Sequence, residues 1–278
     1  MKKKFLYIIA VLIVSCGLCS CGTNKTVQTE ATTAEVQEQA TAKEITAEIT
    51  EEITETSAEA TSEPETETVI IAGQEYQIDA TSAEIILTND SPLVTDISEI
   101  GKLKNLRSLT INNLSDGGPY VVAGLNTLEG CETITEVYIM SGLADASDIH
   151  VLETFPNLKT LIVYGINAYD DFSFDLPSIE RLYTVGTFDL SRIEHLTELK
   201  ELSLEYNTST DLSPIAKLTS LEGLSITECD FTDYSDILEL ENLDGLFISS
   251  APMTKEMYNK IAEKFPDCNI TIINDFID

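Results

Sequence analysis

A stretch of sixteen residues occurs in two similar copies in this sequence, and that recurrence constrains the fold more than any other feature. The first copy, DLSRIEHLTELKELSL, spans residues 189–204, and the second, DLSPIAKLTSLEGLSI, spans residues 211–226. Their aspartate, serine and isoleucine coincide, as do four apolar positions, at an offset of 22 residues. A fixed period of this length predicts a stack of similar supersecondary units, each packed on its neighbours.

The repeat extends through most of the chain. Its core follows an apolar-x-x-apolar-x-apolar pattern, and successive cores start 20 to 28 residues apart. An Asp-x-Ser element precedes many of the cores, starting at residues 96, 145, 189, 211 and 233. The eight cores are SAEIIL at 82, LRSLTI at 106, ITEVYI at 134, LKTLIV at 158, IERLYT at 179, LKELSL at 199, LEGLSI at 221 and LDGLFI at 243.

Each core has the alternation of a β-strand. The fourth and sixth positions are apolar, apart from Thr184, and the fifth position varies. One such strand cannot bury its apolar face alone, but stacked strands form a parallel sheet with a continuous core. Aspartate followed by serine suits the cap of a short helical or 3-10 turn. A calcium ladder of these aspartates is disfavoured, because no glycine-turned ligand loop follows them.

The period and the pattern resemble the leucine-rich-repeat family, in particular the roughly 22-residue repeats of bacterial internalin-like proteins. The resemblance covers residues 82–273. It implies an α/β fold: a right-handed solenoid with a parallel β-sheet on the concave face and short helical or 3-10 turns on the convex face. The family's asparagine after the strand is present as Asn207 and replaced by Cys229. Other repeats depart from it with Leu114, Gly142, Ile166, Thr187 and Ala251.

The first residues carry the features of a secretory signal. Three lysines precede an apolar run from Phe5 to Cys19, which is too short for a permanent membrane-spanning helix. The run ends in LCSC, which resembles the lipobox of bacterial lipoproteins. The resemblance implies that residues 1–20 are a lipoprotein signal peptide and that Cys21 is acylated. A cleavage frame at Cys16 and an ordinary signal peptide are the alternatives.

The remaining segments follow from composition and pattern. Residues 21–67 comprise the acylated cysteine and a disordered Thr/Glu-rich stalk, because too little apolar surface is available to offset the ordering entropy. Residues 68–81 form an N-terminal hairpin cap that turns at Ala72-Gly73. Residues 82–252 are the leucine-rich repeats. Residues 253–278 form a C-terminal cap, in which KEMYNKIAEKF predicts a helix and NITII a last strand.

Charge and motifs exclude several functions. The chain has a net charge of −32, and residues 68–278 alone carry 36 acidic and 11 basic side chains, so the basic footprint of a nucleic-acid-binding protein is absent. The sequence DDFSFD at 170–175 mimics part of a calcium loop, but Leu176 replaces the required glycine. No catalytic motif is present. We therefore expect no enzyme, no cofactor and no metal, and free thiols at Cys131, Cys229 and Cys268.

Strand alternation also predicts which side chains face outward on the concave side. The fifth positions are Ile86, Thr110, Tyr138, Ile162, Tyr183, Ser203, Ser225 and Phe247, and the next outward positions are Thr88, Asn112, Met140, Tyr164, Val185, Glu205, Thr227 and Ser249. Bulky apolar side chains cluster on three adjacent turns. The predicted ligand-binding residues are Tyr138, Met140, Ile162, Tyr164, Tyr183 and Val185, with Glu136, Arg181 and Glu205 at the rim. Alternatively, the long loop of residues 115–130 covers this block.

Two functions fit these features. The first is a monomeric surface-anchored lipoprotein, held outside the cell on the bacterial membrane by its lipid, that binds a protein or peptide on the concave face. The second is a structural scaffold or spacer of the cell envelope without a dedicated ligand. A compact apolar or aromatic patch on the concave face favours the first function, and scattered polar residues favour the second.

The proposed anchor can be tested by metabolic labelling. We expect labelled fatty acid to enter the protein and to be lost in Cys21→Ala, because the lipobox resemblance places the acylated thiol at that residue. Label that persists in this variant would move the anchor to Cys16 or to another residue.

Overall fold

The computed structural model describes residues 67–116 and 118–273. The predictions of a signal peptide over residues 1–20, and of an acylated Cys21 and a stalk over residues 21–67, lie outside this part of the chain except for Glu67. Within it, no helix is long and apolar enough to cross a membrane.

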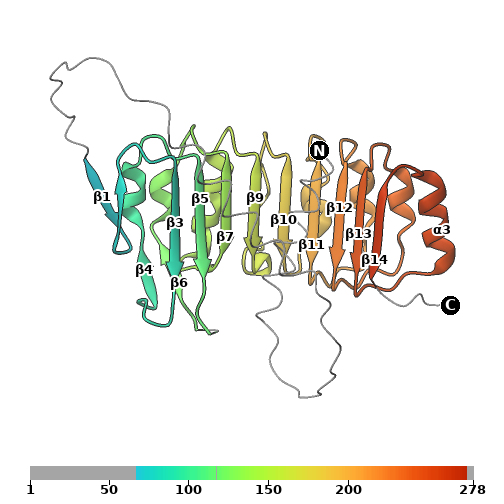
Figure 1. The fold of residues 1–278 in the computed structure, drawn as a ribbon, viewed down its shortest axis with the longest axis horizontal. Coiled ribbons are helices and arrows are strands. Elements are labelled where there is room, and N and C mark those ends of the chain that lie inside the picture. The colour runs from blue at the N-terminus through green and yellow to red at the C-terminus, as the bar shows by residue number, and fades with distance from the viewer. Residues whose placement is uncertain (1–66, 117, 274–278) are drawn as a thin grey trace, which may run out of the picture. The chain divides into compact units, whose positions relative to one another are not determined.

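The main sheet confirms the leucine-rich-repeat solenoid. It is parallel and contains nine strands in the order β14-β13-β12-β11-β10-β9-β7-β5-β3 (Figure 1). Each predicted core contributes one of the first eight strands, and NITII forms the ninth. The strands are β3 (Ser82–Leu87), β5 (Ser108–Asn113), β7 (Glu136–Met140), β9 (Thr160–Tyr164), β10 (Arg181–Val185), β11 (Glu201–Glu205), β12 (Gly223–Thr227), β13 (Gly245–Ser249) and β14 (Asn269–Ile273).

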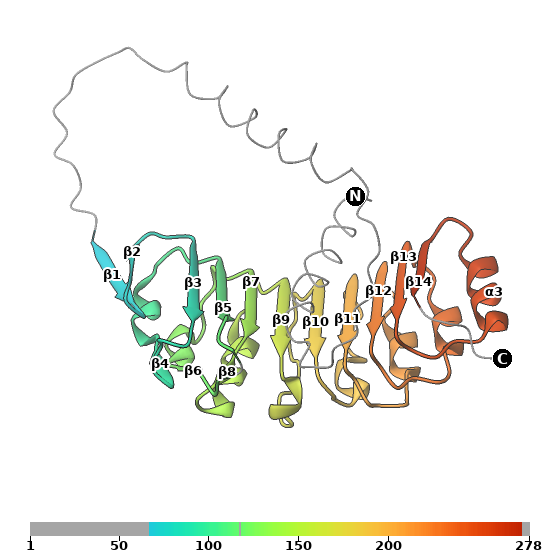
Figure 2. The same ribbon diagram turned by 60° about the horizontal axis from the view of Figure 1, so that its bottom comes forward.

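Short 3-10 helices return the chain along the side away from the sheet (Figure 2). They are η1 (Ser98–Lys102), η2 (Leu125–Leu128), η3 (Ala146–Thr154), η4 (Ile166–Ala168), η5 (Leu190–Ile193), η6 (Ser213–Lys217) and η7 (Ser235–Glu239). The predicted Asp-x-Ser caps precede five of them. Each aspartate Oδ1 accepts a hydrogen bond of 2.8–2.9 Å from the backbone N–H of the serine two residues later, in the pairs Asp96–Ser98, Asp145–Ser147, Asp189–Ser191, Asp211–Ser213 and Asp233–Ser235.

Strand alternation places the core between the sheet and these turns. Leu202 and Leu204 of β11 are buried, as are the equivalent residues of the neighbouring strands. Thr184, the polar exception in this pattern, is also buried, and its hydroxyl donates to the carbonyl of Ser203 over 3.4 Å. The predicted position of the core is therefore confirmed.

The register of the first strand differs from the prediction by two residues. Glu84, not Ile86, pairs with Thr110, and Ile86 pairs with Asn112. The residue that packs inward opposite Leu109 is Ala83, whose small side chain makes a weak apolar signal. The bulkier Ile85 and Leu87, two residues later, give the stronger apolar signal. The predicted inward positions are therefore two residues too late in this strand.

A second, small parallel sheet lies in the first repeats and was not predicted. It contains β4 (Val94–Asp96), β6 (Val121–Ala123) and β8 (Gly142–Leu143) in the order β4-β6-β8. The long segment 115–130 supplies β6 and η2, and Tyr120 donates its hydroxyl to the carbonyl of Asn89 over 3.1 Å. Where this segment is described, its hydrogen bonds go to neighbouring loops and turns, and not to the concave side chains of β7, β9 or β10.

Both ends of the stack have the predicted elements. β1 (Thr68–Ile71) and β2 (Gln74–Gln77) form an antiparallel hairpin whose turn residues, Ala72 and Gly73, have φ of 50° and 80°. At the other end, α3 (Lys255–Lys264) has Thr254 as its N-cap, and the hydroxyl of Thr254 accepts from the N–H of Met257 over 3.1 Å. Helix α3 leads into β14 at the end of the sheet.

The register makes a prediction about stability. Leu202→Ala should lower the free energy of unfolding by about 2–5 kcal/mol, because it leaves a cavity in the core. Ser203→Ala, the adjacent change, should have little effect because it removes one hydroxyl from the concave face. Chemical denaturation of both variants measures the two values, and equal losses would contradict the register.

Candidate functional site

The structure brings the predicted concave residues together on neighbouring strands. Tyr138 of β7 pairs with Ile162 of β9, which pairs with Tyr183 of β10. One step further along the strands, Tyr164 pairs with Val185. Met140 lies at the equivalent position of β7, opposite Asn112. We call these six residues, Tyr138, Met140, Ile162, Tyr164, Tyr183 and Val185, the concave block.

The concave block is less open than the sequence suggests. Tyr138, Met140, Ile162, Tyr164 and Val185 are half-buried. Tyr183 is buried, with 6% of its surface exposed, although the prediction treats it as an accessible anchor. Tyr183 lies on β10 between β9 and β11, and strand alternation alone does not reveal that it is buried.

Tyr183 is held by a polar network. Its hydroxyl donates to Glu201 Oε2 over 2.5 Å, and Arg181 Nε donates to Glu201 Oε1 over 3.3 Å. Burial, followed by the hydrogen bond to this carboxylate, raises the pKa of Tyr183. Burial alone would lower the pKa of Arg181, but the negative charge of Glu201 raises it. Both groups therefore keep their protons at neutral pH, so Glu201 is paired with the cation of Arg181 and also accepts the hydroxyl of Tyr183.

Tyr138 has a similar but looser arrangement. Its hydroxyl donates to Glu136 Oε2 over 3.2 Å. Burial and the charge of Glu136 raise the pKa of Tyr138 to about 12, so the hydroxyl is protonated at neutral pH. In the described part of the chain, no lysine or arginine forms an ion pair with Glu136. Its negative charge is therefore not neutralised in the way that the charge of Glu201 is.

The predicted rim is partly wrong. Glu136 is half-buried and the Arg181 side chain is 35% exposed, as residues at a rim would be. Glu205 is only 8% exposed and lies on β11 between β10 and β12. The sequence reasoning missed Glu201. It occupies the same column of the repeat as Glu136 and Arg181, and that alignment was the available signal.

A ladder of alternating charges borders the block where the strands begin. Glu180 Oε1 lies 2.8 Å from Lys159 Nζ, and Glu180 Oε2 lies 2.9 Å from Lys200 Nζ. The hydrogen bonds from Lys159 and then Lys200 lower the pKa of Glu180 to about 2. Because the three residues come from successive repeats, these ion pairs connect the starts of β9, β10 and β11, and β9 and β10 carry four of the six residues of the concave block.

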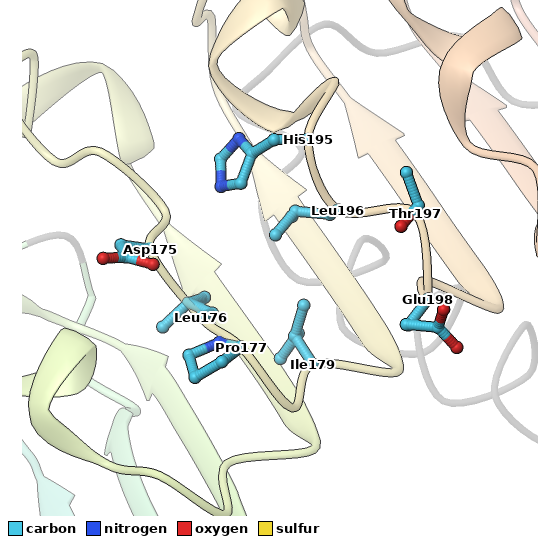
Figure 3. A pocket seen from close by; sticks show the side chains of 8 residues that line it. All are labelled: Asp175, Leu176, Pro177, Ile179, His195, Leu196, Thr197 and Glu198. Atoms are coloured by element: carbon cyan, nitrogen blue, oxygen red, sulfur yellow. The ribbon is translucent and has the colours of Figure 1, made fainter.

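A shallow cavity of about 140 Å³ lies between two turns (Figure 3). The turn before β10 and the turn before β11 line it, and none of the predicted ligand-binding residues contributes to it. Its lining residues are Asp175, Leu176, Pro177, Ile179, His195, Leu196, Thr197 and Glu198. Pockets for small molecules usually enclose about 300–1,000 Å³. This cavity is smaller than that range, so it does not suit a typical small-molecule ligand.

The aspartate-rich segment forms protein contacts. Asp171 Oδ2 lies 3.3 Å from His150 Nε2, and the other ring nitrogen of His150 lies 3.0 Å from Glu153 Oε2. Among the residues that the structure describes, no three His, Cys, Asp or Glu side chains are placed to hold a metal ion. Cys131, Cys229 and Cys268 are free thiols, as expected, and burial raises the pKa of Cys229 to about 11.

Neither a family model nor a curated protein matches the sequence. Among solved structures, internalin C2 of Listeria monocytogenes is similar, with a TM-score of 0.46 and 20% identity over 69% of this chain and 80% of that one. The internalin inlF of the same species has a TM-score of 0.47 and 15% identity over 73% and 71%. A leucine-rich-repeat protein of Leptospira interrogans has a TM-score of 0.44 and 22% identity over 64% and 45%.

The charge ladder predicts a pH-dependent contribution to stability. Because the folded state lowers the pKa of Glu180 from 4.5 to about 2, its ion pairs stabilise the fold above pH 4.5 and lose that effect as the pH falls toward 2. Glu180→Gln should lower the free energy of unfolding by about 1 kcal/mol at neutral pH. Denaturation over a pH series should show this difference vanishing near pH 2. A difference of equal size at both ends of the series would contradict the assignment, and the exposed Glu198→Gln serves as the control.

Proposed function

Because the chain is a leucine-rich-repeat solenoid with repeats of internalin-like length, we propose that it is a recognition module that binds a protein or peptide on its concave face. The observation that carries this proposal is the concave block. Five of its six side chains are half-buried, and they lie on adjacent strands at positions that the core does not use. A contiguous group of aromatic and apolar side chains on a sheet face is typical of a binding surface.

Strands β5 and β12, on either side of the concave block, support the proposal, because their residues at the equivalent positions are small and polar. Next to the block on one side lie Thr110 and Asn112 of β5, and beyond it on the other lie Ser225 and Thr227 of β12. These small polar residues occupy the same columns as the aromatic residues. Bulky apolar exceptions lie nearer the ends of the sheet: the half-buried Ile86 of β3, the buried Phe247 of β13 and the exposed Ile273 of β14. The solenoid therefore tolerates small polar side chains at these positions.

We further propose that the module is a surface lipoprotein. The LCSC box followed by a Thr/Glu-rich segment supports a lipid on Cys21 and a position outside the cell, on the membrane of a bacterium. In this arrangement the protein is a monomer that meets its ligand in the extracellular medium.

One observation favours a different function, that of a structural scaffold or spacer in the cell envelope. Tyr183 is buried, and its hydroxyl is bonded to Glu201 within the same chain. A buried side chain that is hydrogen-bonded within its own chain contributes to the stability of the sheet. A scaffold requires stability and no ligand-binding surface. The scaffold function predicts that changes to the concave block affect stability and not association.

The binding proposal can be tested by affinity capture from envelope material with the full-length protein. The double variant Tyr138→Ala, Tyr164→Ala should bind the captured protein with an affinity about thirtyfold lower. Aromatic anchors contribute about 2 kcal/mol or more to the binding free energy at an interface. Thr110→Ala combined with Thr227→Ala is the matched control on the same face and should leave capture unchanged. If the anchor variant stays folded and captures the same proteins equally well, the scaffold function is preferred.

A further inference from the structure

We propose that the partner segment recognised by this face is cationic. In this proposal, which rests on the proposed function, an extended polypeptide places a lysine or arginine against Glu136 and Tyr138 and an adjacent apolar side chain against Ile162. The membrane anchor and the repeat fold do not specify the partner's chemistry, whereas the charges on the concave side do.

Negative charge dominates the concave positions of the described strands. Carboxylates stand there at Glu84 on β3, Glu136 on β7, and Glu201 and Glu205 on β11, and the single cation on those strands is Arg181 on β10. The wider surface has the same sign, since residues 68–278 have a net charge near −25. An approaching basic segment is therefore attracted, and nucleic acid and anionic lipid are repelled.

The carboxylates of the site are not equivalent. Glu201 already binds Arg181 and the hydroxyl of Tyr183. Glu136 is half-buried and accepts one hydrogen bond of 3.2 Å from Tyr138, a neutral donor. Burial and then the charge of Glu136 raise the pKa of Tyr138, and the charge of Arg181 opposes this shift. A cation from a partner would neutralise Glu136 as Arg181 neutralises Glu201.

The surroundings of Glu136 suit an organic cation on a polypeptide. Tyr138 lies on the same strand and the same face, and a lysine or arginine above an aromatic ring gains a cation–π interaction of about 0.5–2 kcal/mol. Ile162 is the strand neighbour of Tyr138 and offers a half-buried apolar contact. The carboxylate of Glu136 and the ring of Tyr138 suit a basic residue of the peptide. The side chain of Ile162, on the next strand, suits an apolar residue that follows it.

The test uses peptides selected from a random dodecapeptide phage library on the immobilised full-length protein. Selected peptides are synthesised, and their dissociation constants are measured for the wild type and for two variants that change the net charge equally. Glu136→Gln keeps an oxygen that can accept from Tyr138 but removes the charge on the concave face. Glu129→Gln removes an exposed charge from the return segment of the same repeat.

We expect the selected peptides to carry a net positive charge. Their affinity should fall about tenfold in Glu136→Gln, as for the loss of one charged contact, and should not change in Glu129→Gln. The salt dependence of binding should also be weaker in Glu136→Gln than in the wild type.

Three results would overturn the assignment of a cationic partner. Equal loss of affinity in both variants would show that only the overall charge of the protein attracts the peptides. Neutral or acidic peptides that bind and lose affinity in the Tyr138→Ala, Tyr164→Ala variant would exclude a cationic partner but retain the proposed binding face. Failure to select peptides, or peptides that are indifferent to all of these changes, would argue against the cationic partner and the binding face together.

Discussion

Backbone hydrogen bonds between parallel strands hold each repeat in register with the next, and the other features of this molecule depend on that register. The carbonyl of Lys159 accepts from the N–H groups of both Glu180 and Arg181, and the carbonyl of Lys200 accepts in the same way from Glu222 and Gly223. Because equivalent residues pair directly, the inward positions of all repeats form one core and the outward positions form continuous columns. The charge ladder is one such column, and the concave block consists of two others.

The sequence was sufficient to predict the fold because the pattern of apolar core and Asp-x-Ser cap recurs in most of the repeats. Eight apolar cores and five Asp-x-Ser caps indicated the strands and the turns, and the caps form the expected hydrogen bonds. Prediction failed where a repeat departs from the average. At the first strand, Ala83 is a weaker apolar signal than Ile85, so the register was placed two residues too late. Strands β6 and β8 have three residues or fewer, which is too short for an alternation to be recognised.

The site was predictable in its membership but not in its environment. Strand alternation identified which side chains share the concave face, because that depends only on register. Whether Tyr183 and Glu205 are exposed depends on what packs against them in three dimensions, which alternation does not specify, and both are buried. The role of Glu201 likewise depends on Arg181 and Tyr183, which lie 20 and 18 residues earlier in the chain. The repeat alignment places Glu201 in the column of Arg181, but no local sequence signal shows that the two side chains pair.

The polar network beside the concave block bears on the proposed function. Arg181, Glu201 and Tyr183 hold one another by hydrogen bonds, and the charge ladder fixes the same strands at their start. Side chains restrained in this way lose little conformational freedom when a ligand arrives, and an interface that is ordered in advance binds more tightly for the same contact area. In the proposed function, Tyr183 supports its strand neighbour Ile162 and is not itself an anchor. The burial of Tyr183, taken alone, favours the scaffold function. A rigid recognition surface also requires such a buried residue.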